Sequence, residues 1–75
     1  MITKRLFLNF TEDTAAQPVI FNLGQQFDIT TNIVRADMTE SGGTILVEIS
    51  GVAADIEAGI EFAISRGVRV EEAFE

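Results

Sequence analysis

Large apolar side chains occupy every second position in two stretches of this chain, residues 3–10 and 44–50. That period predicts β-strands with one buried face. Residues 28–39 are rich in β-branched side chains and predict another strand. Residues 68–74 predict a fourth. The alternating apolar positions of the first two stretches are Leu6, Leu8, Phe10, Ile45, Val47 and Ile49.

Two segments between these strands place apolar residues at helical spacing. The pattern predicts helices over residues 18–26 and 53–66, the second ending at Gly67. Their apolar stripes are Ile20, Leu23 and Phe27 in the first, and Ile56, Ile60, Ala63 and Ile64 in the second.

The first helix has two competing start signals. Thr14 and Gln17 fit a capping box, whereas Pro18 suits a first helical turn, and these imply different starts. Gly24 lies inside the helix, where glycine costs about 1 kcal/mol relative to alanine. We expect a close backbone approach to account for it.

The resulting order, βαββαβ, predicts an α+β ferredoxin-like fold. In this topology a four-stranded antiparallel sheet carries both helices on one face, and Ser41-Gly42-Gly43 forms the hairpin turn. The second and fourth strands are its edges. The predicted helix-facing set is Leu6, Leu8, Phe10, Ile45, Val47, Ile49, Val68 and Val70, with Val34, Ala36 and Met38 from the second strand.

The opposite face of the sheet is expected to be open. Phe7, Ile33 and Leu46 fall on it and predict an apolar patch for self-association or partner docking. The alternative is that they are scattered surface residues, which are common. A dimer could also form if the second strands of two copies paired edge to edge. From Thr30 to Asp37, only Arg35 and Asp37 are charged residues that would disfavour such pairing.

Asn32 is the polar residue of greatest interest. It shares the parity of Val34, so the pattern predicts that it points inward. A buried amide must be satisfied, either by neighbouring backbone or by a ligand's carboxylate or amine. Both interpretations remain open at this point.

Composition excludes several function classes. The 75 residues suit one domain, 1–75, and contain no cysteine or histidine, which removes the usual nucleophile–base pairs and metal ligands. Glu57 and Glu61 lie on a polar helix stripe and are expected to be solvated. We therefore expect no enzyme activity, no catalytic residue, no metal and no cofactor.

Charge and segment lengths limit the partners. A net charge of −7 disfavours nucleic acid. No apolar run is long enough for direct membrane insertion, and no targeting segment is visible, so a cytoplasmic location is expected.

The tripeptide Asn32-Ile33-Val34 resembles the signature of the NIL domain family, with valine where the family usually has leucine. Pro18, Gly43, Gly51 and Gly67-Val68 extend the resemblance over residues 4–70. Ala63 is smaller than the residue usual in the family. Neither departure threatens the fold, but Val34 shortens a side chain expected to contact the ligand.

The resemblance implies one of two settings. In methionine-importer ATPases, NIL domains are C-terminal regulatory modules that bind methionine, pair with their own copy and inhibit transport. Elsewhere they precede an iron–sulfur ferredoxin segment in proteins linked to homocysteine formation. The second setting is favoured by the pattern at residues 32–36 and by a first strand that starts close to Met1, although no ferredoxin segment is present. A stand-alone protein or a fragment would fit.

The resemblance therefore predicts a regulatory, amino-acid-binding domain that acts as a homodimer. Its ligand would be methionine or a related sulfur amino acid. Asn32 would hold the zwitterionic end, while Ile33 and Val34 would contact the thioether. The alternative is a pure assembly module that docks a ferredoxin or a transporter ATPase domain and binds no metabolite.

Overall fold

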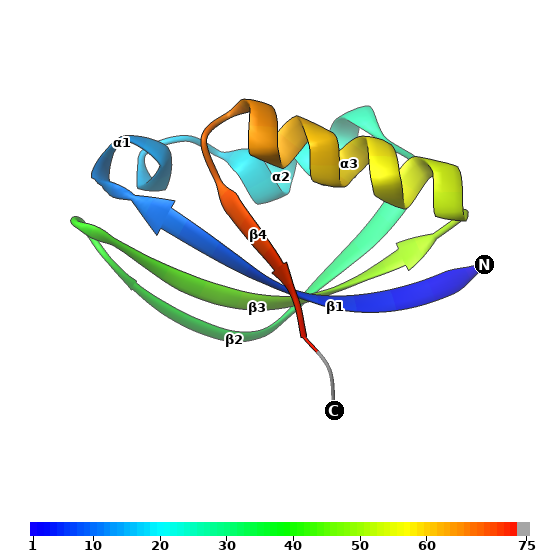
Figure 1. Ribbon diagram of the computed structural model, residues 1–75, viewed down its shortest axis with the longest axis horizontal. Helices are drawn as coiled ribbons and strands as arrows, with labels where there is room; N and C mark the ends of the chain where they lie inside the picture. The colour runs from blue at the N-terminus through cyan, green and yellow to red at the C-terminus, as the bar shows by residue number, and fades with distance from the viewer. Residues whose placement is uncertain (74–75) are drawn as a thin grey trace.

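A four-stranded antiparallel sheet carries all the described helices on one of its faces (Figure 1). The structure, a computed structural model, describes residues 1–73. The strand order is β2-β3-β1-β4, so β2 and β4 are the edges, and the ferredoxin-like prediction is confirmed. The elements are β1 (Ile2–Thr11), α1 (Glu12–Ala15), α2 (Val19–Gln26), β2 (Ile29–Thr39), β3 (Gly42–Gly51), α3 (Ala53–Ser65) and β4 (Arg69–Glu72).

The core lies between the sheet and the two longer helices. The predicted alternation is confirmed, because Leu6, Leu8 and Phe10 of β1 and Ile45, Val47 and Ile49 of β3 are all buried in the core. Burying one such aliphatic side chain contributes about 1.5–3 kcal/mol. The buried apolar set is Leu6, Leu8, Phe10, Val19, Leu23, Ile29, Ile45, Val47, Ile49, Ile56, Ala63 and Val68, with Val70 and Met38 partly buried beside it.

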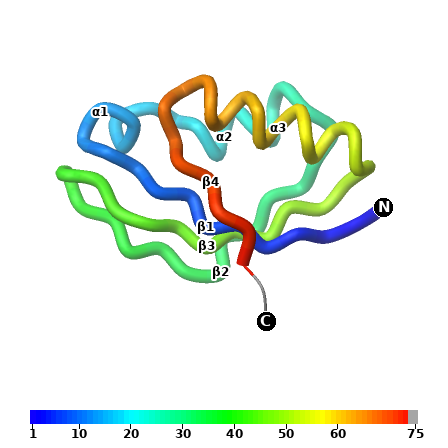
Figure 2. Tube along the Cα trace, viewed as in Figure 1, coloured from blue at the N-terminus to red at the C-terminus, as the bar shows by residue number. Residues whose placement is uncertain are grey.

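A separate short helix follows β1, and the expected capping box at Thr14 and Gln17 is wrong. Thr11 is the N-cap of α1, and its backbone N–H donates to Thr14 Oγ1 at 2.7 Å. The backbone N–H of Thr14 donates in turn to Thr11 Oγ1 at 3.5 Å. Threonine therefore replaces the acidic or amide residue usual at that position. Pro18 is the N-cap of α2, and Figure 2 shows the chain leaving α1 before α2 begins.

A β-bulge in β2 overturns the predicted faces of this strand. Ile33 is opposite Val47, but the next pair is Arg35 with Leu46, so Val34 is an extra residue. Directly opposed residues lie on the same face of the sheet. Because one extra residue is inserted at Val34, the residues before it lie on the face opposite to the one that simple alternation from Met38 predicts. Ile33 therefore lies on the helix side rather than the open side, and Val34 is 43% exposed rather than in the core.

Asn32 is also on the face opposite to the predicted one. Its cross-strand partner is Glu48 on the open side, and Asn32 is exposed rather than buried among apolar side chains. Beyond the bulge the predicted parity holds for Ala36 and Met38, yet Ala36 is exposed because it sits on the edge strand.

Smaller differences concern the helices and the last strand. Ile64 was expected on the buried stripe of α3 but is 56% exposed. A Cβ added at Gly24 would meet nothing within 4 Å, so the expected close approach is wrong. The predicted fourth strand reached Phe74, which lies outside the described residues. No helix within residues 1–73 is long and apolar enough to cross a membrane.

The hairpin between β2 and β3 depends on two glycines. Gly42 and Gly43 have φ values of +114° and +153°. A side chain at Gly42 would overlap the Phe10 carbonyl oxygen, and one at Gly43 would overlap that of Asp37. The predicted hairpin is therefore confirmed, but its turn is Glu40-Ser41, because Gly42 and Gly43 already pair with Thr39 and Met38 as the first residues of β3. The close approach of the strands is the reason for glycine at these two positions.

Candidate functional site

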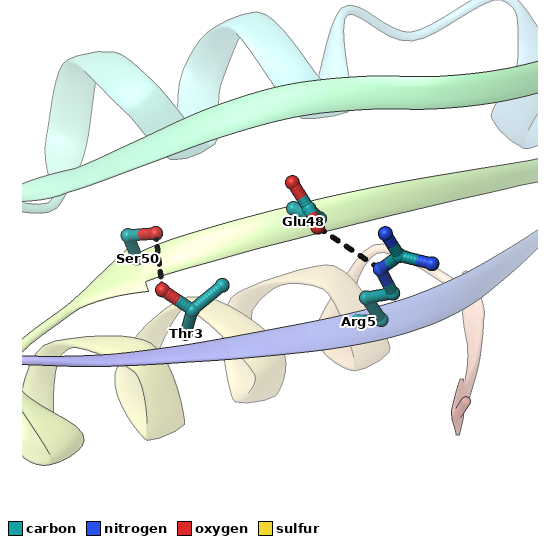
Figure 3. Close-up of polar contacts among 4 residues, drawn as sticks. All are labelled: Thr3, Arg5, Glu48 and Ser50. Atoms are coloured by element: carbon teal, nitrogen blue, oxygen red, sulfur yellow. Dashed lines mark hydrogen bonds and ion pairs between the residues drawn. The ribbon is translucent and has the colours of Figure 1, made fainter. Parts of the chain in front are cut away.

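The open face of the sheet is lined by cross-strand polar pairs between β1 and β3. The hydroxyls of Thr3 and Ser50 lie 2.8 Å apart, and Arg5 Nε donates to Glu48 Oε2 at 2.9 Å (Figure 3). In Figure 3 each pair of side chains points toward its partner across the two strands. A third pair lies farther along the same strands, where Thr44 Oγ1 donates to Asn9 Oδ1 at 2.8 Å.

A shallow pocket of about 140 Å³ interrupts this polar surface. Phe7 and Leu46, which are directly opposed on β1 and β3, form its apolar part. Arg35, Asp37 and Thr44 complete the lining. The pocket thus combines a small apolar floor with one basic and one acidic side chain from the edge strand.

Arg35 differs from the other basic side chains. Within residues 1–73, neither Arg35 nor Asp37 makes an ion pair or side-chain hydrogen bond. The other four cations each have a partner, so Arg35 and Asp37 are charges still available to an external group. The partnered contacts are Lys4 with Glu72, Arg5 with Glu48, Arg69 with Glu71, and Arg66 with the ring of Phe62.

The predicted interface residues are only partly brought together. Phe7 and Leu46 share the open-face pocket, whereas Ile33 lies on the helix side of β2. The apolar patch expected on the open face is therefore reduced to two residues, which weakens the case for association through that face.

The predicted ligand residues follow one another along the outer edge of the sheet. Asn32 lies on the open face, Ile33 is 51% exposed on the helix side, and Val34 is the bulge residue. They do not converge on an enclosed cavity. What they share is a position where side chains and backbone are both accessible from solvent.

An apolar groove lies on the helix side of β2. A hollow of about 150 Å³ runs between α2 and the strands, and both Phe21 and Met38 line it. Phe21 is 64% exposed, and the predicted apolar stripe of this helix does not include it. Its exposure could have been predicted, because Phe21 lies beside the apolar stripe formed by Ile20, Leu23 and Phe27 and not on it.

Comparison with known families assigns the chain. The NIL domain family matches residues 4–72, which is nearly the whole chain. The chain belongs to the NIL domain family. This agrees with the resemblance carried by Asn32-Ile33-Val34.

This NIL domain is similar to parts of longer curated proteins. It is 39% identical over 72 residues to the methionine import ATP-binding protein MetN 2 of Acinetobacter baylyi, covering 91% of this chain. It is 34% identical to MetN of Aliivibrio fischeri over 85% of the chain, and 33% identical to MetN of Coxiella burnetii over 88%. The chain spans about a fifth of the length of these relatives, covering 20–21% of each.

A solved structure has the same fold as this NIL domain. The C-terminal domain of an ABC transporter ATP-binding protein from Enterococcus faecalis superposes with a TM-score of 0.83. The match covers 92% of this chain and 81% of the other, at 22% sequence identity. The similarity therefore supports the ferredoxin-like fold. The expectation that this chain is closer to the ferredoxin-linked NIL proteins stays a prediction.

Proposed function

We propose that this NIL domain is a non-catalytic regulatory domain of the cytoplasm that binds a methionine-like amino acid and acts as a homodimer. Its kinship with methionine import ATP-binding proteins supports the ligand class. In such a protein the domain would report the amino-acid concentration to the transport machinery.

The observation that carries the proposal is the position of the bulge. The register changes immediately after Ile33 of the signature Asn32-Ile33-Val34, on a strand whose outer edge has no neighbouring strand among residues 1–73. At a bulge the extra residue is left out of the regular ladder, so its backbone groups are available to another molecule. Free N–H and C=O groups are the complements of an amino acid's carboxylate and ammonium.

The side chains around the bulge suit the rest of such a ligand. The Asn32 amide has both donors and an acceptor, so it can bond to either end of a zwitterion. Ile33 and Val34 offer apolar surface on which a thioether side chain can be desolvated. A site this open would bind weakly by itself.

Thermal unfolding with and without L-methionine tests the proposal. A ligand specific to the folded state stabilises it by about 2.7 kcal/mol at one hundred times its dissociation constant. In a domain of this size each kcal/mol raises the melting temperature by about 4–8 °C. We expect a concentration-dependent rise with methionine and homocysteine, and none with L-alanine, which has the zwitterion but no thioether chain.

The role of Asn32 needs a matched control. Asn32→Ala is expected to abolish most of the methionine-dependent shift. Asn22→Ala makes the same chemical change in α2, outside the signature, and should leave the shift intact. An unchanged shift in Asn32→Ala would reject this residue as a ligand contact, and a flat response of the unmodified domain would reject methionine binding by this chain.

The alternative function is an assembly module that docks a ferredoxin or an ATPase domain. The open-face pocket favours it, because Phe7 and Leu46 remain accessible there without a partner. In that case a protein partner, and not an amino acid, would raise the melting temperature. Substitution of Phe7 by serine would then weaken partner binding while leaving any methionine response unchanged.

A further inference from the structure

The face of the sheet opposite the helices is not covered by any other element of residues 1–73 (Figure 1). At its centre Phe7 of β1 lies directly opposite Leu46 of β3, and both side chains line the open-face pocket. Apolar area on a sheet is stabilised when a second layer of structure removes it from water. The position of this pair, on the two central strands, makes it a natural contact point for such a layer.

The open face is electrically balanced, although the chain as a whole has a net charge of −7. Cross-strand pairing places three of the five basic residues on this face together with three acidic residues. In the rest of residues 1–73 the other two basic residues are outnumbered by eight acidic ones. An acidic or neutral protein is therefore repelled less at this face than elsewhere on the described chain. The balanced residues are Arg5, Arg35, Arg69, Asp37, Glu48 and Glu71.

Arg35 and Asp37 are the charges of this face that an incoming partner can use. The other four charged residues form two ion pairs with each other, at 2.9 Å and 3.2 Å. Within residues 1–73 neither Arg35 nor Asp37 makes an ion pair or a side-chain hydrogen bond. Both side chains line the pocket beside Phe7 and Leu46. The pocket therefore offers one positive and one negative group next to an apolar floor.

The spacing of these two charges matches that of an α-helix. Residues two apart on a strand share a face and lie about 6.8 Å apart, and residues four apart on a helix are separated by about 6.0 Å along its axis. A helix lying along β3 could therefore set an acidic residue opposite Arg35 and a basic residue opposite Asp37.

The width of a helix also fits this surface. Two intervals between neighbouring strands measure about 9.6 Å, and a helix with its side chains is about 10–12 Å across. One helix would thus reach from the charges of β2, across Leu46, to Phe7 on β1. An extended strand would not cover the face, because strands join a sheet through the backbone at its edge.

We propose that the open face docks an amphipathic helix of a partner protein, through apolar contact with Phe7 and Leu46 and ion pairs with Arg35 and Asp37. The partner helix carries an apolar stripe flanked by an acidic and a basic residue four positions apart. The inference goes beyond the proposed function, since it requires neither methionine binding nor the homodimer.

The small apolar centre makes this complex a transient one. Complexes of that kind bury less than about 1,200 Å² in total. A few central residues carry most of the binding energy in such an interface, which assigns Phe7 and Leu46 the affinity. The charges of Arg35 and Asp37 determine which helix binds, because a partner that sets like charges opposite them is rejected.

Three fluorescently labelled helical peptides of about 15 residues test the proposal. They share one apolar stripe and differ only at two positions, four residues apart beside that stripe. These positions hold glutamate and lysine, two lysines, or two glutamates. Fluorescence anisotropy at about 0.15 M salt measures their binding to the folded domain.

The apolar contact is tested first. The native domain should bind the glutamate/lysine peptide, and Phe7→Ser should raise the dissociation constant about tenfold or more. Phe21→Ser makes the same change at an exposed position of α2, on the other side of the sheet, and should leave the dissociation constant unchanged.

The charges are tested against variants of equal net charge. Arg35→Asp should bind the glutamate/lysine peptide about tenfold more weakly than Arg66→Asp, which makes the same change at the end of α3. It should also bind the two-lysine peptide more tightly than Arg66→Asp does. Asp37→Arg should favour the two-glutamate peptide in comparison with Glu61→Arg in α3. Circular dichroism confirms that each variant is folded.

Two results would overturn the proposal. Equal affinities of Arg35→Asp and Arg66→Asp for every peptide would show that the charges of β2 do not select the partner. Failure of the native domain to bind any peptide at about 1 mM would reject the docked helix. If Phe7→Ser then abolished self-association in sedimentation velocity, the face would belong to a second copy. The melting experiment with methionine is separate, so either proposal can fail while the other stands.

Discussion

Replacing Gly24 by alanine should stabilise this domain. Gly24 lies in the interior of α2, is exposed, and is not among the glycines with positive φ. A Cβ at this position would meet nothing within 4 Å. The substitution therefore gains helix propensity and restricts the unfolded chain without creating a clash.

The magnitude follows from the helix scale. Alanine is favoured over glycine by about 0.5–1 kcal/mol in a helix interior. A domain of this size has a total stability of roughly 4–11 kcal/mol, at about 0.05–0.15 kcal/mol per residue. The gain should therefore be measurable, as an increase of about 2–8 °C in melting temperature.

Urea unfolding followed by far-ultraviolet circular dichroism measures the free energy, and thermal unfolding gives an independent value. Gly43→Ala is the matched comparison, because the same methyl group would there overlap the Asp37 carbonyl oxygen at a φ of +153°. It should destabilise the domain. A Gly24→Ala variant no more stable than the native chain would refute the reasoning and reveal a constraint on α2 that its exposed position does not explain.

Two further predictions concern the core and the first cap. Ile56→Ala removes a fully buried side chain and should lower the free energy of unfolding, measured in urea, by about 2–5 kcal/mol. Ile64→Ala is the same change at an exposed position of α3 and should lower it by less than about 1 kcal/mol. Thr11→Ala removes the cap of α1 and should lower the free energy of unfolding by about 1 kcal/mol. Thr11→Ser keeps the hydroxyl and should retain most of that stability. Equal losses in the two variants would show that the hydroxyl is not the cause.

The candidate site was partly predictable. Phe7 and Leu46 lie together on the open face as the alternation indicated, because β1 and β3 are paired without interruption in register. Asn32 and Ile33 lie on the faces opposite to those predicted. The prediction assumed strict alternation back from Met38, and the extra residue at Val34 breaks that alternation. No local pattern in residues 28–39 marks that position as a bulge.

The sequence by itself determined the order of the four strands and the two longer helices, the buried faces of the central strands and hence the ferredoxin-like topology, but not the short helix α1. A side-chain period of two, with one face against helices, permits a single register for Leu6, Leu8, Ile45 and Val47. The tertiary structure alone decided the exposure of β2. The bulge and the edge position of β2 depend on how this strand pairs with β3, which is a contact between segments distant in the sequence. Both features leave the side chains of Arg35 and Asp37 accessible to another molecule.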